Sequence, residues 1–222
     1  MCGRFTLGVD AAELEEEFEG VAFPPQFAPR YNVAPSQPVM VIPNDGKRTA
    51  TFFIWGMIPS WAKDPSIGSR LINARGETLA EKPTFRGPFK YKRCLILADG
   101  FYEWKSTPGT KFKVPHYIRL ANSKAFGFAG LWSEWQAADG SKVRSCAIVT
   151  TAPNHLLNVI HNRMPVILPS EDHALWLDPA PRSPDDLGHL IKPFPAELMR
   201  AFAVSTLVNS PANDRAECVL PA

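Results

Sequence analysis

The stretch Arg93-Cys94-Leu95-Ile96-Leu97-Ala98 is almost wholly apolar and is followed at once by Asp99-Gly100-Phe101-Tyr102-Glu103-Trp104. A short continuous apolar run beside a glycine-containing turn is typical of a fully buried strand. The pattern predicts a strand over residues 93–98. Working outward, it predicts further strands at residues 3–7, 115–120, 125–132 and 143–151, and a hairpin of residues 38–42 and 51–55 around Asn44-Asp45-Gly46.

Short helices are predicted around these strands. Residues 10–19 form one, with Asp10 as N-cap, Glu13 three residues later and Gly20 as the stop signal. A short helix is predicted at residues 154–160, and two more follow in the last third, with Ser170 and Ser183 as N-caps and Pro184 at the first helical position. Residues 24–38 are proline-rich and are predicted to be irregular, with a loop at residues 30–35. The order of elements favours one α+β domain over residues 1–222, built on antiparallel strands.

Composition narrows the class of protein. Of 222 residues, 45% are hydrophobic and 21% charged, which is usual for a globular protein. The net charge is only +2, so a nucleic acid would have to bind at a local patch. The four cysteines, Cys2, Cys94, Cys146 and Cys218, lie far apart without a CxxC pair, which predicts neither a zinc site nor a disulfide framework. No export signal or membrane-spanning run is recognisable, so we expect a cytoplasmic protein.

The N-terminus, Met1-Cys2-Gly3-Arg4, has unusual chemistry if Met1 is removed. Cys2 would then carry a free α-amine and a thiol, with reference pKa values of about 7.7–8.0 and about 8.5. An amine and a thiol on adjacent carbons react with an aldehyde to form a five-membered thiazolidine. Gly3 leaves room for a large electrophile, and Arg4 places a cation beside it that suits a phosphate. The alternative is that Cys2 is simply a small buried side chain.

Three further polar groups stand among apolar residues. Glu103 lies between aromatic residues, and if its carboxyl group is buried it suits proton transfer. The alternation of side chains along a strand equally allows Glu103 to face solvent at a strand end. His161 follows an apolar helix end, where it either acts chemically or caps a carbonyl. Asn73 and Arg75 follow the apolar pair Leu71-Ile72. Asn73 could orient a substrate and Arg75 could bind a phosphate. The alternative is that both belong to an ordinary turn.

Six motifs occur in an order that matches one family. They are Met-Cys-Gly-Arg-Phe, Arg-Tyr-Asn-Val-Ala-Pro, Trp-Gly-Met-Ile-Pro-Ser-Trp, Ile-Asn-Ala-Arg-Gly-Glu-Thr, Ala-Asp-Gly-Phe-Tyr-Glu-Trp and Ile-His-Asn-Arg-Met-Pro-Val-Ile-Leu. The chain resembles the SRAP (SOS response-associated peptidase) family from Cys2 to the closing Glu217-Cys218-Val219-Leu220-Pro221. The resemblance implies a single SRAP domain with a barrel-like core of antiparallel sheets, short flanking helices and a mature chain that starts at Cys2.

The resemblance also implies a function. Family members sense abasic sites in single-stranded DNA during the DNA damage (SOS) response, and their N-terminal cysteine crosslinks to the ring-opened sugar as a thiazolidine. By position, Cys2, Asn73, Glu103 and His161 match the active-site residues. The DNA-binding positions matched are Arg4, Arg75, Trp61, Pro35, Ser36 and Thr150, and Asn162 is given no role. The family's peptidase label implies self-removal of Met1, and its lesion chemistry resembles that of a lyase.

Two other functions stay open on the residues alone. Glutamine amidotransferases with an N-terminal nucleophile also begin Met-Cys-Gly, and there the Cys2 thiol would attack an amide. The third possibility is a DNA-binding module that forms no covalent bond. For the SRAP-like function we expect a monomer without metal or cofactor, partnered by abasic single-stranded DNA and associated with the nucleoid when bound.

Overall fold

The structure is a computed structural model that describes residues 2–222, and Met1 lies outside the described residues. Its centre is a closed barrel of five strands that run in the order β10-β4-β3-β6-β9 and back to β10. Neighbouring strands are antiparallel except β10 and β4, which are parallel. The five are β3 (Pro38–Pro43), β4 (Thr51–Trp55), β6 (Arg93–Ala98), β9 (Phe126–Gln136) and β10 (Lys142–Thr151).

Alternate residues of the barrel strands enter two different hydrophobic clusters. On β6, Cys94 and Ile96 belong to an inner cluster that contains residues from all five barrel strands. Leu95 and Leu97 belong to an outer cluster together with apolar residues of the helices. Because side chains alternate across a strand, the helices cover the outside of the barrel. This two-sided burial explains why residues 93–98 show an unbroken apolar run.

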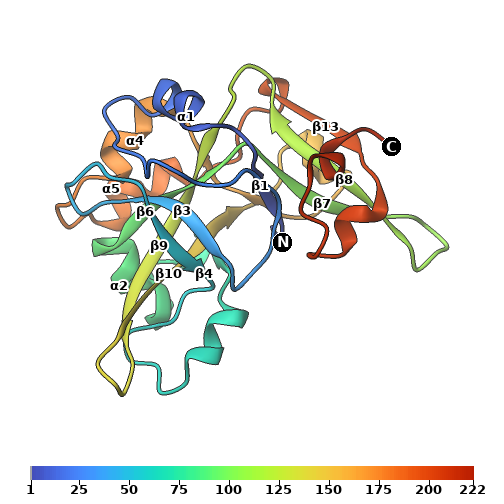
Figure 1. Ribbon diagram of the computed structural model, residues 1–222. Coiled ribbons are helices and arrows are strands. Elements are labelled where there is room, and N and C mark those ends of the chain that lie inside the picture. Colours follow the sequence, from blue (N-terminus) through green and yellow to red (C-terminus); the bar gives the residue numbers. More distant parts are fainter. Residues whose placement is uncertain (1) are drawn as a thin grey trace.

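A second sheet of five strands lies beside the barrel, in the order β13-β8-β7-β1-β2. Its strands are β13 (Met199–Ala203), β8 (Lys113–Leu120), β7 (Gly100–Ser106), β1 (Phe5–Leu7) and β2 (Arg30–Val33). Only Asp99 separates β6 from β7, so the chain passes directly from the barrel into this sheet. Figure 1 shows β7, β8 and β13 on the side of the barrel opposite α1, α4 and α5.

Three very short strands complete the sheets. β5 (Asn73–Arg75) pairs in parallel with β10, and β11 (Met164–Pro165) pairs with β10 in the antiparallel sense. β12 (Ile167–Leu168) pairs with β9. The helices are α1 (Ala11–Glu17), α2 (Pro83–Tyr91), α3 (His155–Asn158), α4 (Ser170–Trp176) and α5 (Pro184–Leu187). None of the helices among residues 2–222 is long and apolar enough to cross a membrane.

Much of the predicted element order is confirmed. The α+β class, the strand at residues 93–98 and the β3–β4 hairpin are as expected. Asp10 and Glu13 form a capping box at the start of α1, and Ser183 caps α5 ahead of Pro184.

Two local predictions were wrong, and some elements were not predicted. Residues 30–33 form strand β2 rather than a loop, because β1 supplies a pairing partner. Pro169, not Ser170, is the N-cap residue of α4. Helix α2 and strand β13 were not predicted.

Arg93 joins the barrel to the helices. Its side chain is fully buried, and its guanidinium donates to the carbonyls of Phe89 and Lys90 in α2 and of Trp176, Asp178 and Ala180 at the end of α4. Carbonyls at helix C-termini lack partners within the helix. One buried cation therefore satisfies the ends of two helices at once.

Candidate active site

The N-terminal strand brings Cys2 next to Glu103. Phe5 of β1 is paired with Phe101 of β7, and the Tyr102 N–H donates to the Arg4 carbonyl at 3.0 Å. Continuing this antiparallel register places Gly3 opposite Glu103. Two segments that lie a hundred residues apart in the chain thus form one side of the site.

The thiol of Cys2 is fully buried within the inner cluster, with Sγ 4.0 Å from the Arg4 carbonyl oxygen. Burial raises the pKa of Cys2 well above its usual value, and the nearby Glu103 carboxylate raises this pKa further. Charge on sulfur is disfavoured here, so the thiol is protonated at neutral pH.

Glu103 is buried, with 3% of its surface exposed. It therefore does not occupy the solvent-facing position that alternation equally allowed. Burial raises the pKa of Glu103 to about 7, and the positive charge of Lys113 opposes this increase. A carboxyl group with this pKa gains and loses a proton readily near neutral pH.

His161 approaches Glu103 from the other side. It follows α3, and its backbone N–H donates to the Leu157 carbonyl at 2.8 Å. Nε2 lies 3.9 Å from Glu103 Oε2, and Nδ1 lies 3.1 Å from the Arg163 backbone nitrogen and 3.2 Å from the Arg163 carbonyl oxygen. Burial lowers the pKa of His161, which favours the neutral ring at pH 7.

Asn73 is placed by β5, where it pairs with Ile148 of β10. Its Nδ2 donates to the Cys2 carbonyl at 2.9 Å, which holds the N-terminal segment in place. Its Oδ1 is buried without a hydrogen-bond partner among the described residues. A buried acceptor without a partner costs free energy unless another group supplies a donor.

Arg163 was quoted within a motif but was not predicted as a site residue. Its guanidinium makes two hydrogen bonds with the Glu77 carboxylate, at 2.6 and 2.9 Å, and donates to the Thr150 carbonyl at 2.7 Å. These contacts fix the segment whose backbone N–H orients His161. Its position two residues after His161 was the only sign in the sequence that Arg163 could belong to the site. Its partners Glu77 and Thr150 could not be predicted, because they come from distant segments of the chain.

The predicted DNA-binding arginines have different surroundings. Arg75 is exposed on β5. Arg4 is half-buried, and its guanidinium donates to Asn32 Oδ1 at 2.8 Å and to the carbonyls of Val208 and Asn209. Arg4 thus holds the C-terminal segment against β1 and β2. Trp61 is 62% exposed.

Ser36 lies at the end of β4 nearest Asn73. Its N–H donates to the Trp55 carbonyl at 2.7 Å, and the Trp55 indole donates to the carbonyl of Ile72. Ser36 is exposed and has a positive φ of 70°, whereas Pro35 before it is half-buried. Thr150 differs from both, since it is fully buried and its hydroxyl accepts from Arg163 at 3.1 Å.

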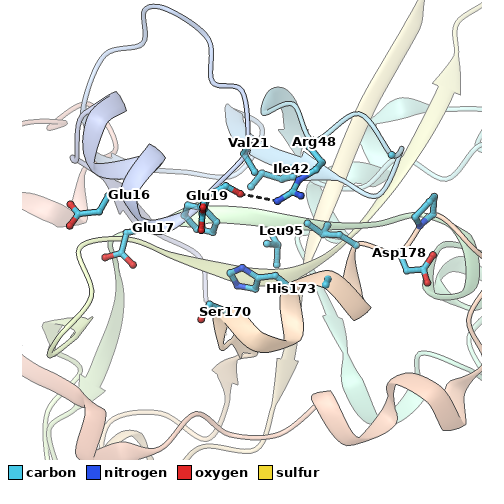
Figure 2. Close-up of a pocket in the computed structure, with 15 residues that line it drawn as sticks. Glu16, Glu17, Glu19, Val21, Ile42, Arg48, Leu95, Ser170, His173 and Asp178 are labelled. Atoms are coloured by element: carbon cyan, nitrogen blue, oxygen red, sulfur yellow. Dashed lines mark hydrogen bonds between the residues drawn. The ribbon is translucent and has the colours of Figure 1, made fainter.

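A separate cavity of about 760 Å³ lies on the helical side of the barrel (Figure 2). Its floor includes Ile42 and Leu95 of the outer cluster, whereas Cys2 belongs to the inner cluster. The barrel wall therefore separates this cavity from the site. Within residues 2–222, no group of three or more His, Cys, Asp or Glu side chains could hold a metal ion.

The model of the family described as SOS response associated peptidase (SRAP) matches residues 1–211. The chain belongs to the SRAP family. Its curated relatives include abasic site processing protein YoqW of Bacillus subtilis, 48% identical over 222 residues and covering 99% of both chains. Abasic site processing protein HMCES of Mus musculus is 32% identical over 237 residues, covering 90% of this chain and 67% of the relative.

Solved structures share the fold. A crystal structure of a protein from Bacteroides thetaiotaomicron superimposes with a TM-score of 0.89 at 28% identity, covering all of both chains. A second, from Bordetella bronchiseptica, has a TM-score of 0.78 at 25% identity and covers 92% of this chain. The family model and the curated relatives confirm the SRAP resemblance predicted from six motifs.

Proposed function

We propose that this SRAP protein processes abasic sites in single-stranded DNA by forming a covalent thiazolidine at Cys2. One observation carries the proposal: Cys2, Asn73, Glu103 and His161 come from four separate segments and gather around the N-terminal residues. Relatives that cover nearly the whole chain are named abasic site processing proteins. The aminothiol of Cys2 supplies the chemistry that an aldehyde lesion needs.

The formation of the thiazolidine has three steps. The Cys2 amine, free once Met1 has been removed, attacks the aldehyde of the ring-opened deoxyribose. The carbinolamine loses one water and leaves an imine. The thiol then adds across the carbon–nitrogen double bond, so that sulfur bonds to carbon and the thiol proton moves to nitrogen. Protein and DNA are joined with the loss of one water, and no imine remains to promote strand cleavage by β-elimination.

Glu103 is proposed to move the protons of these steps. With a pKa of about 7, it can accept a proton from the Cys2 ammonium and later return one. The raised pKa of the Cys2 thiol favours the order given above, with the amine reacting first and the neutral thiol closing the ring.

His161 and Asn73 are proposed to act on the sugar and on the new N-terminus. His161 Nε2 faces Glu103, and in the tautomer that carries its proton on Nε2 the ring can donate this proton to the sugar ring oxygen, which favours the open aldehyde. The buried Oδ1 of Asn73 can accept a hydrogen bond from the freed amine or from a sugar hydroxyl.

The exposed Arg75 and Trp61 are proposed to bind the strand, through a phosphate and a base respectively. Arg4 contributes mainly through the C-terminal segment that it holds. Pro35 and Ser36 are proposed to lie along the DNA path, and Thr150 is proposed to contribute by supporting Arg163. Self-removal of Met1, the monomeric state and the cytoplasmic location stay predictions.

The test is an oligonucleotide with one abasic site, analysed on a denaturing gel. We expect a stable adduct with the wild type, none with Cys2→Ala, and binding without an adduct when the lesion is a reduced analogue that lacks the aldehyde. A wild-type protein that binds the natural lesion without ever forming an adduct would favour the non-covalent module. Hydrolysis of free glutamine that depends on Cys2 would favour the amidotransferase.

A further inference from the structure

The hairpin that joins β7 to β8 has a composition unlike the rest of the surface. Between Trp104 and Pro115 it carries Lys105, Lys111 and Lys113 and no acidic residue. Phe112, between two of these lysines, is 81% exposed, the highest value among the exposed large hydrophobic side chains of the described residues. In Figure 1 this hairpin extends away from the body of the molecule, beyond the ends of β7 and β8.

A groove of about 880 Å³ runs along the base of the hairpin. It is lined by residues of the hairpin, among them Trp104, Phe112 and Pro115, and by residues of the C-terminal segment, among them Val204, Thr206 and Asn209. Lys111 and Lys113 also line it. The described residues that line it include no Asp or Glu, and they include Ala222, the last residue of the sequence.

The groove has a firm inner wall. The Trp104 indole N–H donates to Asn209 Oδ1 at 2.8 Å, and the Arg4 guanidinium carbon lies 6.0 Å from the centre of the Trp104 ring. The Trp104 ring is thereby held between the β7 strand and the C-terminal segment. A fixed aromatic wall can receive a planar group without losing much side-chain freedom.

The base of the groove lies close in the sheet to the candidate active site, although Glu103 and Trp104, as neighbours on one strand, point to opposite faces. Trp104 directly follows Glu103 on β7, and β8 pairs Pro115 with Trp104 and His116 with Glu103. Lys113 is near enough for its charge to act on both Glu103 and His161. A strand that runs from a lesion at Cys2 towards Lys113 would therefore reach the β7–β8 hairpin, and with it the edge of this groove, within a few nucleotides.

We propose that the β7–β8 groove binds the undamaged single strand on one side of the lesion, with a base stacked on Phe112 and phosphates against Lys111 and Lys113. The inference rests on the proposed function and names a further part of its DNA site. An exposed aromatic between two cations fits unpaired nucleotides, because bases offer a stacking face and the backbone offers one negative charge per residue. Paired bases in a duplex do not expose that face.

The experiment compares a short abasic oligonucleotide, with one nucleotide on each side of the lesion, with longer ones extended on the 5′ or the 3′ side. For the wild type we expect one extension to tighten binding. Phe112→Ala should weaken binding of that extended strand by about fivefold to a hundredfold, the range for losing one stacked base. Lys111→Ala should lower the salt dependence of its binding by about 0.7 in log–log slope.

Lys47→Ala and Phe52→Ala are the matched controls, since Lys47 is an exposed lysine of the β3–β4 turn and Phe52 is a 46% exposed aromatic of β4. Both should bind all oligonucleotides as the wild type does. The proposal is overturned if Phe112→Ala and Lys111→Ala bind the extended strands as tightly as these controls. It is also overturned if polyglutamate displaces DNA from wild type and Phe112→Ala equally well. Adduct formation by the wild type on the short oligonucleotide tests the proposed function separately.

Discussion

At the scale of single residues, Glu103 gives the protein a measurable dependence of stability on pH. Burial raises its pKa from 4.5 to about 7, so between these values the folded state holds more protons than the unfolded state. The protonated Glu103 carboxyl therefore makes its full contribution to the free energy of unfolding below about pH 4.5. This contribution is lost as the pH rises through about 7, because the buried carboxyl then ionises. The shift corresponds to about 3 kcal/mol as an order of magnitude.

Glu103→Gln should therefore change stability in a pH-dependent way. The amide has nearly the shape of the protonated acid but cannot ionise, so the variant should gain free energy of unfolding over the wild type as the pH rises from 5 to 8. Urea melts at several pH values measure this difference. A constant difference across the range would mean that Glu103 does not titrate within it.

The two proton-transfer residues should differ in the step that they affect. Glu103→Ala should slow adduct formation by about 10²–10⁴-fold, most strongly between about pH 7 and 8, where the Glu103 carboxylate is ionised and much of the Cys2 amine is still protonated. His161→Ala should slow formation less and should also slow release of DNA from the finished adduct. Formation and reversal rates across pH check both roles. Unchanged reversal in His161→Ala, or a pH-independent defect in Glu103→Ala, would contradict them.

The sequence singled out Glu103, His161 and Asn73 because each polar group stands among apolar residues. The sequence did not decide whether Glu103 is buried, because the alternation of side chains along β7 does not show which face of the strand is covered. That depends on β1, which lies about a hundred residues earlier in the chain. The partners of Arg4 and Thr150 were likewise unpredictable, because Val208 and Arg163 come close only in the folded molecule.

At the scale of elements, the short turn between β6 and β7 depends on Gly100. A Cβ added there would lie 2.2 Å from Cζ and from the hydroxyl oxygen of Tyr117. The Tyr117 hydroxyl is hydrogen-bonded to the hydroxyl of Thr6. Gly100→Ala should destabilise the protein by about 1–3 kcal/mol, because the Tyr117 ring must move.

Gly87→Ala is the matched control for this substitution. Gly87 lies in helix α2 with nothing within 4 Å of an added Cβ, so the change should stabilise the protein by about 0.5–1 kcal/mol. Thermal melts of both variants measure whether each substitution raises or lowers the stability of the protein. A Gly100→Ala protein as stable as Gly87→Ala would show that β8 does not pack against this turn as described.

Elements with a local signal were predicted, and those fixed by distant partners were not. The β3–β4 hairpin and the α1 capping box lie within a few residues of their own signals. Strand β2 was taken for a loop because its backbone N–H groups are satisfied by β1 and by Asp214, far along the chain. Helix α2 was missed because it contains Pro88, which normally ends a helix.

At the scale of the whole molecule, Arg93 connects the barrel to two helices through five backbone carbonyls. Arg93→Met would fill similar space but leave those buried acceptors without a donor. We expect a loss on the order of 3–5 kcal/mol in the free energy of unfolding, measured by urea denaturation. Arg119→Met, at an exposed position of β8, should change it little. Equal stability of the two variants would contradict this role of Arg93.

The central claim is that the amine and the thiol of Cys2 both bond to the same carbon of the lesion. The most direct measurement is the intact mass of the adduct before and after treatment with borohydride, together with its reaction with a thiol-alkylating reagent. We predict a mass equal to protein without Met1 plus DNA minus one water, unchanged by borohydride and resistant to alkylation at Cys2. An adduct that gains two hydrogens on reduction and leaves the Cys2 thiol open to alkylation would be an open imine and would contradict the account.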